Sequence, residues 1–478
     1  MDLYKKFKRN IFNIAELKNN DKLLLSVSGG PDSLVMFDLA LRLREDYGID
    51  LGVFHLDHCL RDESDIEAEM VREICRNNQV VYWIKKEDIS NINAEKSGSI
   101  EAIAREVRFN HLKKIYFKGK FDGVLTGHQA NDQIETMLFN LFRGSGLEGL
   151  TGMNMTSYYD NMFLIKPLLN IWREEIENYC NKKGLRPSID KSNYTLKYTR
   201  NRIRNELIPY LEEHFNDSIK LTLYDTINLI RDEHRLINSI VDDIFIELVI
   251  ESGEGYLDLD IKKLYSQDIA IQRRVIRKSI FKIKGNLDGI YQKHINILTG
   301  AIKDEVETKE TGKDYQMPGG VTCRVEYNTI SFRTEKWYKK HKTSYFKVVI
   351  PDLGEYTLPD GNRIRLEKFK INQIDWKKYI EMNIIFIDYD ELEWPLVLRH
   401  RKAGDRFKPL KMEGTKKIKD YFIDSKIPKY KRDKTPILVD AKDRIIWLVG
   451  ERMDDRFKID SKTQNILMVK YEFKKEGE

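Results

Sequence analysis

The stretch Ser28-Gly29-Gly30-Pro31-Asp32-Ser33 combines residue types that bind phosphate. Glycines let the backbone pass close to a phosphate group, and a helix that starts here offers unpaired N–H groups and a positive dipole. The serine hydroxyls add donors, whereas Asp32 cannot attract phosphate and is suited to hold Mg²⁺ or to orient the loop. A tight turn with Asp32 or Ser33 as a helix N-cap is the structural alternative. The stretch is not the Walker pattern G-x-x-x-x-G-K-[ST].

Two further stretches place histidine and acidic side chains close together. His55, Asp57 and His58 lie within four residues of one another, but no third and fourth metal ligand stands nearby in the sequence. A role at the end of a strand is therefore favoured over a metal site. Asp132 and Glu135 stand three apart, so on a helix their carboxylates share a face. They either complement the helix dipole or recognise an ammonium group.

Basic residues are concentrated in two places. Arg200, Arg202 and Arg204 suit phosphate contact or a clamp on an adenylate, with a charged helix start as the alternative. Residues 399–434 contain fourteen Lys or Arg and five Asp or Glu, although the whole chain carries a net charge of only +6. Aromatic residues interleave this basic region, which favours contact with an RNA backbone over a merely solvated surface. The basic residues expected to contact RNA are Arg399, Arg401, Arg406, Lys416 and Lys417.

The elements around these residues alternate between strands and helices. Strands are predicted at 22–27, 49–56, 80–84 and 122–126, and helices at 32–44, 63–77, 99–117 and 131–142. This alternation predicts an α/β fold with a doubly wound parallel sheet. Ligands bind at the carboxyl ends of the strands in such sheets, and the stretches described above fall there.

The 478 residues are too many for one hydrophobic core. We expect a catalytic domain over 1–212, a helical middle domain over 213–314, a β-rich connecting region over 315–390 and a basic α+β domain over 391–478. No run of about eighteen apolar residues suggests a membrane span, and no apolar segment follows the basic N-terminus as in a signal peptide. The four cysteines form no C-x-x-C pair, which argues against zinc or disulfides and favours the cytoplasm.

Several motifs resemble known families. The SGGPDS loop after a strand resembles that of the N-type ATP pyrophosphatases, or PP-loop enzymes, which have a Rossmann-like sheet and leave AMP on a substrate. Other stretches resemble signatures of the tRNA(Ile)-lysidine synthetases. These stretches are HLDHCLR (55–61), EAIAREVRF (101–109), GHQANDQIET (127–136), RGSGL (143–147), KPLL (166–169), IDKSN (189–193), RNRIR (200–204) and the block from Leu398 through Phe422.

The resemblance implies a two-step reaction. ATP adenylates the C2 oxygen of the wobble cytidine, at position 34, in the CAU anticodon of tRNA(Ile), and the ε-amine of free lysine then displaces AMP to give lysidine. The implied cofactors are ATP and Mg²⁺, and a homodimer is an implied assembly.

By this resemblance, residues 28–33, His55, Asp57 and His128 hold the nucleotide. Asp32, Asp132, Glu135 and Arg204 serve catalysis, and Arg105, Arg108, Arg200 and Arg202 join the acidic pair in holding lysine or tRNA. A tRNA thiolation enzyme and a non-catalytic RNA-binding protein are the alternatives.

Overall fold

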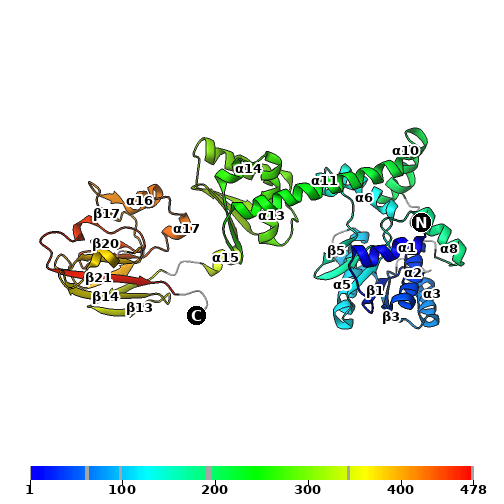
Figure 1. The fold of residues 1–478 in the computed structure, drawn as a ribbon, viewed down its shortest axis with the longest axis horizontal. Coiled ribbons are helices and arrows are strands. Elements are labelled where there is room, and N and C mark those ends of the chain that lie inside the picture. The colour runs from blue at the N-terminus through cyan, green and yellow to red at the C-terminus, as the bar shows by residue number, and fades with distance from the viewer. Residues whose placement is uncertain are drawn as a thin grey trace. The chain divides into compact units, whose positions relative to one another are not determined.

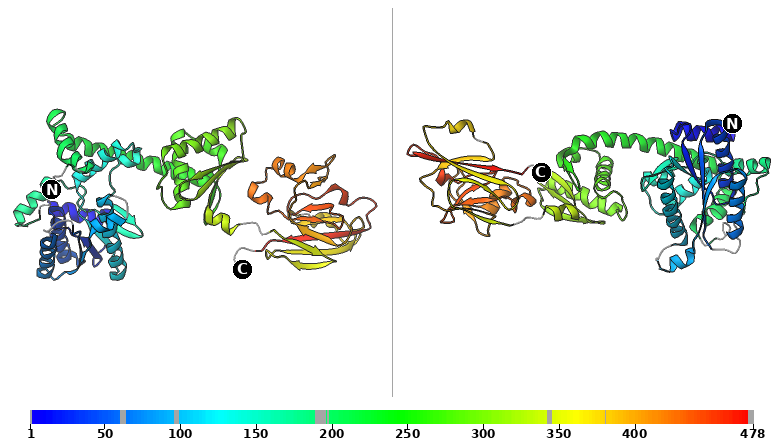
Figure 2. Two further views of the ribbon diagram at one scale, coloured as in Figure 1. Left: turned by 180° about the vertical axis from the view of Figure 1, so that it is seen from behind. Right: turned by 90° about the horizontal axis from the view of Figure 1, so that it is seen from below.

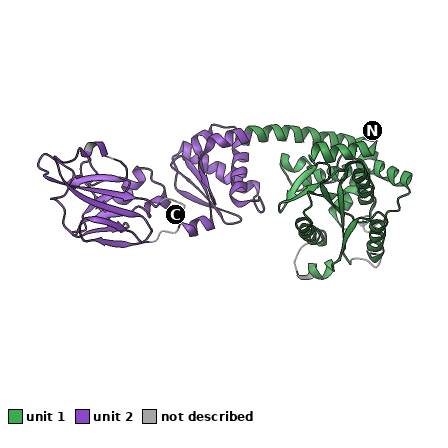
Figure 3. Ribbon diagram, turned by 60° about the horizontal axis from the view of Figure 1, so that its bottom comes forward, with its two compact units in different colours: residues 1–240 green, residues 241–478 purple. Residues whose placement is uncertain are grey.

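The computed structural model describes residues 2–59, 64–95, 99–188, 196, 198–341, 345–379 and 381–474. The chain divides into two compact units, residues 1–240 and 241–478, which are coloured separately in Figure 3. Each unit has its own sheets and its own core, so the two are described one after the other.

Unit 1 is built on a six-stranded sheet in the order β3-β2-β1-β4-β6-β5. β1 pairs in parallel with both β2 and β4, so the chain winds outward first to one side of β1 and then to the other. Only the edge strand β5 runs antiparallel. The strands are β1 (Lys22–Ser26), β2 (Asp50–Asp57), β3 (Val81–Lys86), β4 (Gly123–Thr126), β5 (Thr156–Tyr159) and β6 (Met162–Ile165). This is the expected doubly wound sheet, and β1 and β4 flank its switch point.

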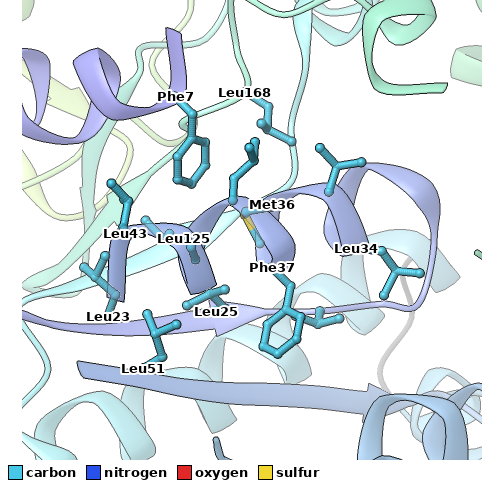
Figure 4. Close-up of a cluster of buried hydrophobic side chains, with 14 of the residues drawn as sticks. Phe7, Leu23, Leu25, Leu34, Met36, Phe37, Leu43, Leu51, Leu125 and Leu168 are labelled. Atoms are coloured by element: carbon cyan, nitrogen blue, oxygen red, sulfur yellow. The ribbon is translucent and has the colours of Figure 1, made fainter. Parts of the chain in front are cut away.

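Alternating side chains of the strands enter two cores. Leu23 and Leu25 of β1 pack under the helices of one face, whereas Leu24 packs with Phe109 and Leu112 on the other. Figure 4 shows the first core, and Figures 1 and 2 show helices on both faces of the sheet. The helices of this unit are α1 (Leu3–Arg9), η1 (Asn10–Ile14), α2 (Pro31–Tyr47), α3 (Ser64–Asn77), α4 (Ile89–Glu95), α5 (Ile100–Gly119), α6 (Ala130–Phe142), α7 (Leu147–Leu150), α8 (Arg173–Lys183), α9 (Thr199–Arg202), η3 (Ile203–Leu207) and α10 (Ile208–His214).

The eight elements predicted between residues 22 and 142 are confirmed within a few residues. Sequence reasoning missed the β5–β6 hairpin, whose four-residue strands are too short to show clear alternation. The long helix α11 (Ile219–Leu248) lies in the range expected to be helical, and the limit between the two units falls within it.

The first part of unit 2 corrects the expectation of a helical domain over 213–314. A sheet in the order β7-β8-β11-β10-β9 stands there, and two of its strands, β7 and β8, lie wholly inside the range expected to be helical. The expected limit between residues 314 and 315 falls inside β9. The elements are β7 (Val249–Gly253), β8 (Tyr256–Asp260), α12 (Ile261–Tyr265), α13 (Ile269–Lys284), α14 (Gln292–Glu307), β9 (Lys313–Met317), β10 (Val321–Glu326), β11 (Thr329–Thr334) and α15 (Glu335–Lys340).

The second part of unit 2 holds two four-stranded sheets, β12-β16-β19-β20 and β13-β14-β21-β15, and the two-stranded β17–β18. The strands expected as one region over 315–390 are thus divided among three sheets, because strands pair with segments far along the chain. The elements are β12 (Lys347–Ile350), β13 (Gly354–Thr357), β14 (Arg363–Lys370), η4 (Trp376–Tyr379), β15 (Ile384–Asp388), β16 (Leu396–Arg399), β17 (Arg406–Phe407), β18 (Lys416–Lys417), α16 (Ile418–Asp424), α17 (Lys429–Arg432), β19 (Ile437–Val439), β20 (Ile445–Leu448), η5 (Asp455–Phe457) and β21 (Asn465–Glu472).

Within the described ranges, no helix is both long enough and apolar enough to cross a membrane.

Candidate active site

The glycine-rich loop joins β1 to α2 and is held in shape from within. The Ser33 hydroxyl accepts the N–H groups of Ser28 (3.2 Å) and Gly29 (3.1 Å) and lies 2.9 Å from the Gly30 carbonyl, to which it donates. Gly29 has a φ of 91°, which favours glycine. Pro31 occupies the first turn of α2, where no N–H is required. The expectation that both serines donate to phosphate therefore needs revision, because the buried Ser33 hydroxyl is engaged inside the loop.

The loop packs closely against the end of β4. A Cβ added at Gly127 would lie 3.3 Å from the Ser33 nitrogen and 3.5 Å from the Asp32 Cβ. Position 127 favours glycine because the backbone of the loop passes close beside it. This contact brings the two predicted motifs, 28–33 and 127–136, into one place.

His55 and Asp57 end β2 beneath the loop and are both buried. His55 Nδ1 lies 2.9 Å from the Val27 carbonyl, and burial lowers the pKa of His55, so a neutral ring donates to the backbone that enters the loop. The Asp57 carboxylate accepts the Cys59 N–H at 2.9 Å and lies 3.8 Å from Lys86 Nζ. These contacts give both residues a supporting role at the strand end.

Two carboxylates and one guanidinium form the centre of the site. Arg204 Nε donates to Glu135 Oε1 at 2.5 Å, and its Nη2 lies 3.0 Å from both Glu135 Oε2 and Asp132 Oδ1. Asp132 also accepts the Gln129 N–H at 2.9 Å as part of a capping box at the start of α6. Arg204 lies on the π-helical turn η3, a local widening that is frequent at functional sites. The predicted acidic pair thus shares a helix face and binds a cation.

The acidic side chains hold protons more tightly than usual. Burial raises the pKa of Asp32 to about 7, assisted by the charge of Asp132, while Arg173 and then Arg204 oppose the shift. Burial also raises the pKa of Glu135 to about 7 and raises the pKa of Asp132, and Arg204 lowers both. Arg204 is thus the cation that most strongly stabilises the charged forms of Asp132 and Glu135, whereas Arg173 acts more strongly than Arg204 on Asp32.

The remaining predicted cations flank this centre. Arg105 and Arg108 lie over the Phe109 ring, with guanidinium carbons 4.8 and 5.6 Å from its centroid. Arg200 lies over Phe139 at 5.8 Å. Arg202, on the same short helix as Arg200, is exposed.

His128 lies among the cations of this site. Burial and the charges of Arg108, Lys166, Arg105 and Arg200, in that order, lower the pKa of His128 to about 3. Lys166 is the first residue of the KPLL motif but is not among the predicted site residues. Its burial beside β4 depends on the strand β6, which sequence reasoning missed.

The basic residues of the C-terminal region differ in exposure. Arg399 is 3% exposed and pairs with Asp405 (2.8 Å) and Asp443 (3.1 Å), so its predicted contact with RNA is corrected to an internal ion pair. Arg401 pairs with Asp433 at 2.5 Å.

Two of the other predicted residues, Arg406 and Lys417, are exposed, whereas Lys416 is partly buried and pairs with Asp424.

Some motif residues lie outside the described part of the chain. They are Leu60 and Arg61 of the second motif and residues 189–193.

The fold and the loop define the class of the protein. A phosphate loop at the switch point of a parallel sheet, with buried carboxylates beside it, is the arrangement of a PP-loop nucleotide enzyme. Residues 3–211 match the PP-loop domain family, and residues 396–470 match the TilS substrate C-terminal domain family.

The curated relatives identify the family more closely. A tRNA(Ile)-lysidine synthase from Caldanaerobacter subterraneus is 33% identical over 470 residues, covering 98% of this chain and 97% of the relative. Another from Clostridium tetani is 32% identical over 464 residues, with 97% of each chain covered. A crystal structure of a TilS C-terminal domain is 26% identical, covers 28% of this chain and 99% of its own, and gives a TM-score of 0.25. The chain belongs to the tRNA(Ile)-lysidine synthase family.

Proposed function

We propose that this chain ligates free lysine to C2 of the wobble cytidine of tRNA(Ile), with ATP cleaved to AMP and pyrophosphate. The C2 oxygen of cytidine is a poor leaving group until it carries a phosphate ester, so it is adenylated first. The loop over residues 28–33 holds the phosphates through backbone N–H groups at the start of α2. The product is lysidine, which pairs with adenosine.

The observation that carries this proposal is the binding of a cation by Asp132 and Glu135 beside the loop. Lysine is protonated at neutral pH and must lose a proton before it attacks. A buried carboxyl pair binds the ammonium and accepts its proton, and the raised pKa of Glu135, about 7, suits a general base. Arg204 holds this cation position through its bonds to both carboxylates, and it would offset phosphate charge when lysine takes that position.

Mg²⁺ fits the site through Asp32. Asp32 Oδ1 is buried and has no hydrogen-bond partner among the described residues. Over the same residues, no group of three or more His, Cys, Asp or Glu side chains could hold a metal. One carboxylate with ATP phosphates is a usual Mg²⁺ environment, so Asp32 would hold the ion that neutralises those phosphates.

In the C-terminal region, the exposed cations contact the tRNA, among them Arg406 and Lys417. A cytoplasmic location follows from the tRNA substrate, and the homodimer stays a prediction. Thiolation is disfavoured because the chain has no C-x-x-C pair and because three of its four cysteines, Cys75, Cys180 and Cys323, are buried.

The test is incubation of the chain with ATP, labelled lysine and a tRNA(Ile) transcript that carries the CAU anticodon. We expect lysine transfer that requires cytidine at the wobble position and is lost in Asp32→Ala. No lysine transfer to the CAU transcript, or AMP formation by Asp32→Ala at the wild-type rate, would contradict the proposal.

A further inference from the structure

A group of cations meets where β4 and β6 end. The two strands pair at Leu125–Ile165, and their pairing resumes at Gln129–Leu168. Between these points the chains carry His128 on one side and Lys166 on the other. α5, which packs on both strands, carries Arg105 and Arg108, and α9 carries Arg200. The charges that act most strongly on His128 are these four cations.

Lys166 is the most unusual member of the group. Its side chain is 7% exposed, and burial together with the nearby Arg105 lowers its pKa to about 8. The ammonium donates to the Asn154 carbonyl (3.1 Å) and to Ser157 Oγ (3.0 Å), which uses two of its three protons. Among the described residues, no carboxylate lies within ion-pair distance of Lys166. Burial of such a cation is costly, and an anion bound beside it would offset that cost.

The arginines around Lys166 suit a phosphate group. Arg105 is exposed on α5, and the Phe109 ring lies beneath the guanidinium groups of Arg105 and Arg108. A planar guanidinium offers paired N–H donors that match two phosphate oxygens. The exposure of Arg105 leaves this end of the group open to a long ligand such as a polynucleotide.

His128 contributes a fixed, neutral ring. Its Nδ1 lies 3.0 Å from Thr126 Oγ1. When the Thr126 hydroxyl donates to Nδ1, the single proton of the neutral ring is on Nε2 and can donate to an anion. A neutral donor adds a hydrogen bond without adding to the repulsion among the four cations.

We propose that Lys166, together with Arg105, Arg108, Arg200 and His128, binds a backbone phosphate of the RNA substrate next to the target cytidine. This inference rests on the proposed function and moves His128 from the nucleotide to the RNA. ATP already has the N–H groups of the loop at the start of α2, whose residues Asp32 and Ser33 pack against Gly127. A phosphate ester is the shared chemistry, and ATP is the competing source.

The test measures RNA and ATP binding separately with the full-length chain. Lys166→Met removes the charge and fills the buried position with an apolar side chain of similar length. We expect its dissociation constant for the labelled tRNA(Ile) transcript to rise about tenfold, and the slope of log K against log salt to fall by about one. The dissociation constant for a non-hydrolysable ATP analogue should stay within about twofold of wild type. Lys114→Met, at an exposed position of α5, is the matched control and should bind RNA like wild type.

Arg105→Gln tests the same group of cations in case Lys166→Met does not fold. It changes an exposed helix position, where substitution should leave folding intact. It should weaken RNA binding several-fold at an unchanged thermal unfolding midpoint. Wild-type RNA affinity in both variants would overturn the inference, as would a loss confined to ATP or a raised KM for lysine alone. Failure of the proposed function is a separate result, namely that the wild-type chain binds the RNA but transfers no lysine.

Discussion

Arg204 offers a quantitative test of the electrostatics of the site. Arg204→Met would remove the guanidinium that lowers the pKa values of Asp132 and Glu135 most strongly and that also lowers the pKa of Asp32. Removal of one partner from a buried ion pair costs about 3–5 kcal/mol. We expect the free energy of unfolding to fall by that amount at about pH 8, where the carboxyls would have to ionise without this charge.

The loss should depend on pH with a definite sign. Without Arg204 the folded-state pKa values of the carboxyls rise further above their unfolded values. Such a carboxyl destabilises the fold as pH rises from the unfolded pKa through the folded pKa, because the folded state then binds more protons than the unfolded state. The variant should therefore be near wild-type stability at about pH 5 and much less stable at about pH 8.

Urea denaturation at these two pH values, without ATP and Mg²⁺, measures the effect. Arg202→Met, at an exposed position just before Arg204, is the control and should change stability by less than about 0.5 kcal/mol at both pH values. Adding Glu135→Gln to Arg204→Met should recover part of the loss at the higher pH. An equal loss at both pH values, or a loss no larger than that of Arg202→Met, would refute the reasoning.

Three further predictions concern the loop and the C-terminal region. Asp32→Asn removes a carboxyl whose pKa is raised to about 7 and which must therefore be charged, at a cost, at about pH 8. Urea denaturation at that pH without ATP and Mg²⁺ should show a gain of about 2–4 kcal/mol in stability. The same variant should form no AMP. Gly127→Ala brings a methyl group 3.3 Å from the Ser33 nitrogen. Calorimetry should therefore show several-fold weaker ATP binding, whereas a filter-binding assay should show an unchanged affinity for RNA. Arg399→Gln breaks the buried Arg399–Asp405 pair and should cost about 3 kcal/mol in urea denaturation. Arg406→Gln, at an exposed position, should instead weaken RNA binding at unchanged stability. Opposite outcomes at these last two positions would contradict our division of the basic residues.

Much of unit 1 is predictable because its strands are apolar runs between clear turn signals. β1 and its loop illustrate this, since Leu23–Leu25 are fully buried and Gly29 marks the turn. β7 in unit 2 is different. Four of its five residues, Ile250–Gly253, are exposed, so this edge strand has no apolar alternation to detect and depends on its partner β8.

The residue types of the site are predictable from the sequence, but their pairing is not. Asp132 and Glu135 are close because of helical spacing, whereas Arg204 reaches them from a segment about seventy residues further on through tertiary packing. The predicted contact of Arg399 with RNA is wrong for a related reason. The number of basic residues in the region does not show that Asp405 and Asp443 pair with Arg399.

The pairing of β14 with β21 has a consequence for synthesis of the protein on the ribosome. β21 is an inner strand between β14 and β15, yet residues 371–464 separate it from β14. Domains generally fold as units during translation, with N-terminal ones first. The unit that holds the PP-loop can therefore fold early, whereas this sheet keeps the edge of β14 unpaired until residue 472 has left the ribosome. Slow translation between these strands would prolong the exposure of that edge, and chaperone demand should be greatest in this interval.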